Sequence, residues 1–142
     1  MRNSCRSSGS ASDQLRGSAR RALPRHWSDA EPDDLHELRK RVVAHRYQME
    51  TVAPVWPRFG RMWVGEAQRL RDRLGRHQDL TLLAALTQPH RPLAAWRSRL
   101  TPAIAQRMKD HVARSRRIAA RLFVEKPNAF RRRLKVIWET GG

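Results

Sequence analysis

Apolar side chains recur every three or four residues along most of this chain, which is the spacing of a helix with one buried face. The first such stripe comprises Leu35, Leu38, Val42 and Met49. A longer stripe follows, made of Phe59, Trp63, Ala67, Leu70, Leu74, His77 and Thr81. The third comprises Ile104, Met108, His111, Ser115, Ile118 and Leu122. Because no segment alternates with a period of two, the pattern predicts an all-α protein, an antiparallel bundle of long helices.

Prolines mark where these helices begin and end. We predict a short helix over residues 13–23, ended by Pro24, and longer helices over 32–53 and 59–86. The third and longest helix is predicted over 93–124, restarting at Pro102 with Thr101 as its N-cap. A short helix over 128–138 closes the chain. Residues 1–12 are predicted to be a disordered tail, and residues 13–142 to form one helical domain.

The charge of the chain adds a preference for anions. Lys and Arg number 30 against 13 acids, a formal net charge of +17. Residues 91–135 alone hold 14 basic residues and two acids. Only four of the basic residues are Lys, and the planar guanidinium of Arg suits paired contacts with phosphate. A genome rich in G and C would also raise the Arg content, so composition alone leaves both explanations open.

Part of this charge lies beside a buried stripe. His36, Arg39, Val43, Arg46 and Tyr47 share one face of the helix predicted over 32–53. A second set repeats the same offsets later in the chain: His36, Arg39, Arg41 and Arg46 correspond to His111, Arg114, Arg116 and Arg121. These faces could hold a linear polyanion, or they could be solvated surfaces, and His77 and His111 could be ordinary core residues.

Other functional classes find little support in the sequence. With only Cys5, the chain has no intramolecular disulfide and no cysteine-based metal site. No run of 18 apolar residues predicts a membrane span. There is no phosphate-binding glycine loop and no nucleophile elbow, and acids are too few for a two-metal site. We therefore predict no catalytic residue, no metal and no cofactor.

Three segments, in order, resemble the CHAD domain family, the conserved-histidine α-helical domains. They are "LHELRKRVVAHRYQMETVAPVWP", "LRDRLGRHQDLTLL" and "ARLFVEKPNAFRRRLKVIW", within a similarity spanning residues 13–139. The closing motif resembles the end of the family's domain, so the chain resembles its C-terminal half. The resemblance implies half of a paired helical bundle around a basic pore that binds inorganic polyphosphate. It also implies a cytoplasmic protein, associated with polyphosphate granules or with a CYTH-type protein.

The resemblance also implies particular binding residues. His36 and Arg39 match the family's H-x-x-R helix, Lys40 and Arg46 fall where it has cations, and Asp79 matches a structural acid. Val43 and Ala44 stand where the family commonly has Lys or Arg. With the closing motif and the second basic face included, the predicted polyphosphate-binding residues are His36, Arg39, Lys40, Arg46, Arg114, Arg121, Lys126 and Arg132.

We therefore expect a polyphosphate-binding module rather than an enzyme. A basic helical protein that binds nucleic acid is the alternative, and a polyphosphate hydrolase is the third possibility. Half of a two-part bundle would leave an apolar face exposed, so we also predict a homodimer or pairing with a missing N-terminal CHAD half.

Overall fold

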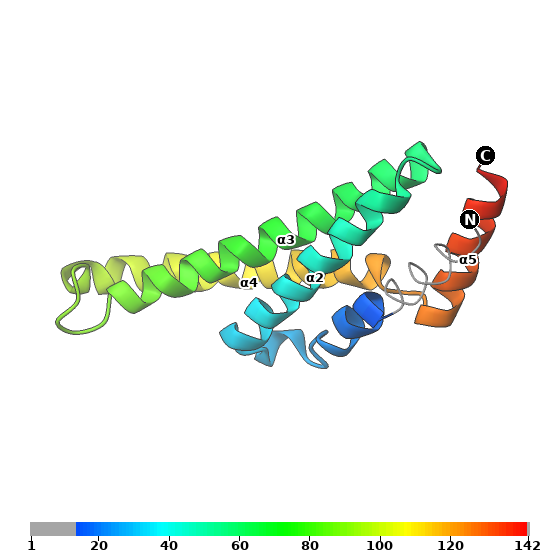
Figure 1. Cartoon of the computed structure of the whole chain (residues 1–142). Coiled ribbons are helices and arrows are strands. Elements are labelled where there is room, and N and C mark those ends of the chain that lie inside the picture. Colours follow the sequence, from blue (N-terminus) through cyan, green and yellow to red (C-terminus); the bar gives the residue numbers. More distant parts are fainter. Residues whose placement is uncertain (1–13, 142) are drawn as a thin grey trace.

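The computed structural model describes residues 14–141, and every regular element in that range is helical (Figure 1). A helix over residues 14–21, called the N-terminal helix below, comes first. The long helices are α2 (Pro32–Val52), α3 (Pro57–Leu86), α4 (Arg97–Leu122) and α5 (Pro127–Thr140). Two short 3-10 turns, η1 (Trp27–Asp29) and η2 (Ala94–Trp96), connect them. The all-α prediction is confirmed, whereas the tail predicted over 1–12 lies outside the described residues.

Proline sets the start of three of these helices. Pro32, Pro57 and Pro127 lie in the first turns of α2, α3 and α5, where a backbone N–H has no partner to lose. Asp33 and Asp34 follow in the first turn of α2, at the positive end of the helix dipole. These signals explain why the predicted helix boundaries agree closely with the structure.

Two details of the predicted helices are wrong. The longest helix is α3, with 30 residues against 26 in α4. Helix α4 also runs without interruption through Pro102, and its N-cap is Trp96 rather than Thr101. Because Pro102 has no N–H, the carbonyl oxygen of Ser98 lacks its helical hydrogen bond. Pro102 lies close to the start of α4 and Ser98 is exposed, so water can offset this loss.

Helix α3 is the centre of the arrangement, because it packs against α2 on one side and α4 on the other. Figure 1 shows α3 and α4 as an antiparallel pair that extends beyond α2. The N-terminal helix lies below α2 in this view, and α5 lies at the end away from the loop that joins α3 to α4. The predicted stripes form most of the core. Its buried apolar residues are Ala19, Leu35, Leu38, Val42, Met49, Trp63, Ala67, Leu70, Leu74, Ile118, Ala119, Leu122, Phe123, Phe130, Leu134 and Ile137.

A buried cation joins the two ends of the sequence in what we call the arginine hub, made of Arg16, His45, Trp63, Phe123 and Phe130. Arg16 is fully buried. Its guanidinium donates hydrogen bonds to the carbonyl oxygens of residue 122, at 3.2 Å, and residue 125, at 2.8 Å, and lies 4.1 Å from the Phe130 ring centroid. These partners satisfy a charge that would otherwise be costly to bury. The guanidinium in turn caps the C-terminal end of α4 by binding its carbonyl oxygens.

Candidate anion-binding site

Two of the predicted α2 residues, His36 and Arg39, lie along the boundary between α2 and α3. His36 and Arg39, with Arg46 further along, form what we call the α2 row. The His36 Nδ1 atom is 2.9 Å from the Gln78 Oε1 atom of α3. Arg39 runs across Gly75 of α3, where an added Cβ would lie 3.3 Å from the Arg39 Nε atom. The helix face proposed from the sequence is therefore closed on one side by α3.

The side chains of the α2 row are more engaged than a free cationic face would be. Only 18% of the Arg46 side chain is exposed, and its guanidinium is 3.2 Å from Glu50 and 4.8 Å from the Tyr47 ring centroid. The Nε atoms of Arg39 and Arg46 are buried without a hydrogen-bond partner. Lys40 is exposed but lies 3.3 Å from the Glu37 carboxylate. The α2 row can still offer positive charge to an anion, and some of its side chains also stabilise the contact between α2 and α3.

A denser group of cations lies on the other side of α3, across its contact with α4. We call Arg69, Arg73 and Arg76 of α3, with His111 and Arg114 of α4, the α3–α4 cluster. Burial first, then the charges of Arg114, Arg76 and Arg69, lower the pKa of Arg73. Like charges are therefore close enough to oppose one another, and an anion among them would relieve that repulsion.

One acid, Glu66, offsets part of the positive charge at the end of the cluster nearer the start of α3. Glu66 lies 2.8 Å from Arg69 and 3.8 Å from Arg121 of α4. Arg121, which the sequence predicted as a binding residue, is thus partly neutralised, whereas Arg114 belongs to the cluster itself. Arg73, Arg76 and Arg114 are the cluster cations for which the structure gives no acidic partner among the described residues.

The predicted residues do not all meet in one site. Lys126 is the N-cap of α5 and Arg132 lies on α5, which Figure 1 places at the opposite end from the loop joining α3 to α4. Arg69, Arg73 and Arg76 are not among the binding residues predicted from the sequence. Their spacing of four and three residues, which places them on one face of α3, was the available signal.

Burial also changes two histidine pKa values in this region. Burial lowers the pKa of His77, which lies on the core face of α3. The pKa of His111 is lowered by burial first, and then by Arg73, Arg76, Arg114 and His77. The prediction that His77 is a core residue is confirmed, whereas His111 is only partly buried and faces a cation.

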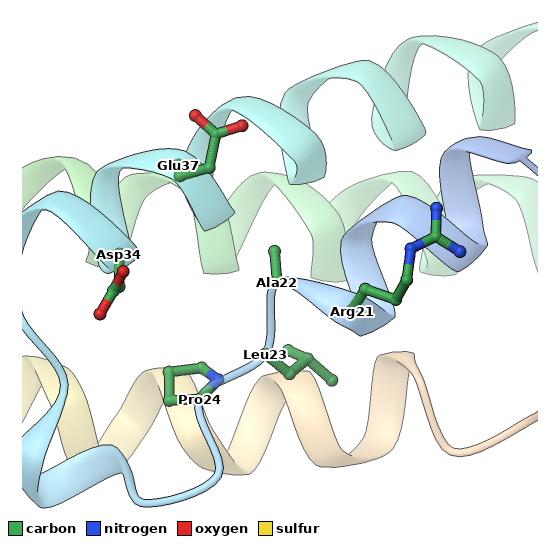
Figure 2. Close-up of a pocket in the computed structure, with 6 residues that line it drawn as sticks. All are labelled: Arg21, Ala22, Leu23, Pro24, Asp34 and Glu37. Atoms are coloured by element: carbon green, nitrogen blue, oxygen red, sulfur yellow. The ribbon is translucent and has the colours of Figure 1, made fainter.

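A pocket beside the start of α2 has a different character from these basic faces. It occupies about 260 Å³ between the end of the N-terminal helix and the start of α2. Figure 2 shows Asp34 and Glu37 of α2 along this pocket, with Arg21 across from them and Ala22, Leu23 and Pro24 between. Two carboxylates in the lining disfavour a polyanion there, so the pocket is not part of the candidate site.

Residues 14–141 lack two further features. No three His, Asp or Glu side chains there are grouped so that they could hold a metal ion. No helix in the same range combines the length and the apolar character that crossing a membrane requires.

An all-helical basic protein with cations on both sides of a central helix is the class that these observations define. Comparison with protein families matches residues 4–88 to the CHAD domain. That match covers more than half of the chain, which therefore belongs to the CHAD domain family. The match covers the first part of this chain and does not reach the closing motif, so the assignment to the family's C-terminal half stays a prediction. No curated protein and no solved structure matches the chain.

Proposed function

We propose that this protein binds inorganic polyphosphate on the basic faces beside α3, with the α3–α4 cluster as the principal contact. The observation that carries the proposal is the group of arginines around Arg73, whose charges, after burial, lower the pKa of Arg73, beside the contact of Arg73 with His111. Repulsion among them costs folding free energy that a bound anion would recover. Membership of the CHAD domain family supports phosphate as the anion, because the family is linked to polyphosphate binding in general.

The spacing of the cations suits an extended ligand. Arg69 and Arg76 are seven residues apart on α3, which corresponds to roughly 10 Å at a rise of 1.5 Å per residue. A chain with a negative charge at every repeat can contact several such positions at once. Each well-formed hydrogen bond between a guanidinium and phosphate contributes about 1.5–3 kcal/mol.

The principal test removes two cations from the cluster. We expect Arg73→Ala with Arg114→Ala to weaken binding of long-chain polyphosphate at least tenfold, as measured by isothermal titration calorimetry. The matched control is Arg91→Ala with Arg97→Ala, which removes the same charge from the region of the loop between α3 and α4. We expect the control to change affinity less than threefold. Equal losses in the two variants would mean that only net charge matters, and would contradict the site.

Salt dependence provides a second measurement. If about six cations contact phosphate, the logarithm of the affinity should fall with the logarithm of salt concentration at a slope near −4, using about 0.7 per contact for a single strand. A slope near zero would show that the basic faces are not where the ligand binds.

Nucleic acid remains the alternative ligand. The exposed aromatic rings that could stack on bases come from separate segments: Tyr47, Trp56, Trp96 and Trp138. Because single-strand recognition relies on such rings arranged together, we expect polyphosphate to displace bound DNA at a lower concentration of phosphate groups. Displacement in the opposite direction would favour nucleic acid.

A phosphate-release assay with Mg²⁺ tests our proposal that the module binds rather than hydrolyses its ligand.

A further inference from the structure

One contact in the α3–α4 cluster joins a cation to a histidine. The Arg73 Nη1 atom lies 3.5 Å from the His111 Nδ1 atom, at the long end of hydrogen-bond distances. A guanidinium can only donate hydrogen bonds, so Arg73 can donate to His111 only when Nδ1 of His111 is unprotonated. The contact therefore fits a neutral His111 that carries its proton on Nε2 and accepts from Arg73.

The surroundings of His111 oppose its protonation. Burial and the charges of Arg73, Arg76 and Arg114, together with His77, all lower its pKa. Those groups lie on α3 and on His111's own helix. Of the other elements that pack against α4, η2 has no ionisable side chain, and Asp29 of η1 is not among the groups that shift this pKa. No acid among the described residues is seen to offset these cations at His111.

We propose that His111 takes up one proton when a phosphate-rich anion binds the α3–α4 cluster, as Arg73 moves from His111 to the anion. This inference rests on the proposed function and adds a regulated binding residue to it. Arg73 stays charged throughout, and the added proton comes from solvent and is placed on Nδ1. The imidazolium can then donate a hydrogen bond from Nδ1 to a phosphate oxygen. In the free protein, neutral His111 acts as a substitute partner that keeps Arg73 in place.

The direction of the resulting pH dependence follows from the two states. The anion favours charged His111, so the pKa is higher in the complex than in the free protein, where it lies below the ordinary value of 6.5. Binding should therefore strengthen as pH falls from about 8 to 6. The gain approaches tenfold for each unit by which the anion raises the pKa.

The direct test follows His111 itself in the intact protein. Imidazole resonances are recorded by NMR across pH with and without long-chain polyphosphate, whose few chain ends contribute little titration of their own. His111→Gln, which can accept from Arg73 but cannot become charged, assigns the resonance. We expect the His111 pKa to rise by at least one unit on binding. Calorimetry at pH 6.5, in two buffers of different ionisation enthalpy, should show that His111→Gln lowers the proton uptake that accompanies binding.

A second histidine variant provides the control. His26→Gln, an exposed residue before η1, should keep both the affinity and the proton uptake of the wild type. His111→Gln should lose most of the gain in affinity between pH 8 and pH 6. If wild-type protein binds polyphosphate while the His111 pKa stays unchanged, the inference is overturned and the proposed function stands. If wild-type protein does not bind polyphosphate, both fail. Should His111→Gln not fold, triple-resonance assignment of the wild-type protein identifies the His111 signal, and the wild-type titration then decides the question.

Discussion

The arginine hub and the α3–α4 cluster use the same side chain for opposite purposes. Arg16 in the hub is fully buried, and carbonyl oxygens and aromatic rings surround its guanidinium. Arg73 in the cluster is partly exposed, and its nearest charged neighbours are other arginines. The comparison teaches that net charge alone does not identify a binding residue. An arginine whose hydrogen bonds are already made holds the fold together, whereas one surrounded by like charges is available to an anion.

The histidines show the same contrast. In the hub, the Trp63 Nε1 atom donates to the His45 Nε2 atom at 3.1 Å. The proton of neutral His45 is therefore on Nδ1, which is buried without a partner. In the cluster, the contact with Arg73 favours the other tautomer of His111, with its proton on Nε2. Added acid should thus weaken the hub and strengthen anion binding at the cluster.

The largest effect is expected from breaking the hub. Arg16→Met should destabilise the protein by about 3–5 kcal/mol, because several carbonyl groups at the end of α4 lose their partner and the Phe130 ring loses a stacked cation. Urea unfolding followed by circular dichroism measures this change. The control Arg132→Met, at an exposed position on α5, should shift the free energy of unfolding by less than about 0.5 kcal/mol. Similar values for the two variants would mean that the hub is not a distinct structural element.

The hub should also make the fold sensitive to acid. Burial, with the nearby charge of Arg16, lowers the pKa of His45 to about 3 from 6.5. The unfolded chain therefore binds a proton that the folded protein refuses, and stability falls as pH drops below 6.5. This amounts to about 2 kcal/mol between pH 7 and pH 5. Thermal unfolding across pH should be flatter for His45→Gln than for wild type, and His26→Gln should keep the wild-type slope. An unchanged slope in His45→Gln would contradict this assignment.

The α2 row lies between these two extremes. From the sequence alone, we expect Arg39→Ala with Arg46→Ala to weaken polyphosphate binding at least tenfold and to leave helicity and thermal stability nearly unchanged. The structure changes the second expectation, because both side chains are partly buried, Arg39 lies against Gly75 of α3 and Arg46 pairs with Glu50. We expect a loss of about 1–2 kcal/mol in the free energy of unfolding, and a smaller loss of affinity than in the variant that lacks Arg73 and Arg114. A larger loss of affinity would make the α2 row the principal site.

The smallest effect is expected from two glycines of α3. Gly65→Ala should stabilise the protein by about 0.5–1 kcal/mol, because open space surrounds the site and Ala favours a helix. Gly75→Ala should gain less, since the new Cβ would lie 3.3 Å from Arg39 and displace its guanidinium slightly. Polyphosphate affinity should fall up to threefold in Gly75→Ala and stay constant in Gly65→Ala. Identical behaviour of the two variants would show that Gly75 does not position Arg39.

The sequence predicted the helices well, because prolines and apolar spacing are local signals. Pro32, Pro57 and Pro127 mark helix starts, and the stripe through Trp63, Leu70 and Leu74 is buried. The burial of Arg16 could not be predicted in this way. Its partners lie more than 100 residues away, and arginine is ordinarily exposed.

The candidate site was predicted only in part. Its cations on α2 and α4 were recognised from their offsets, whereas Arg69, Arg73 and Arg76 were passed over on a helix assigned to the core. The arginines of α3 lie beside the basic residues of α4 only because of how the two helices pair. Local spacing in the sequence does not determine that pairing. Pairing with a second copy or with another CHAD half stays a prediction, which sedimentation at micromolar concentration can test.

The contacts of Arg16 also have a consequence for the order of folding. Arg16 and Arg20 bind the carbonyl oxygens at the end of α4, more than 100 residues later in the chain. Helices α2, α3 and α4 can pair through much shorter loops, whose closure costs less entropy. The N-terminal helix should therefore dock late, after α4 has formed, although the ribosome makes it early. Substitutions at Arg16 should then accelerate unfolding while leaving the folding rate nearly unchanged.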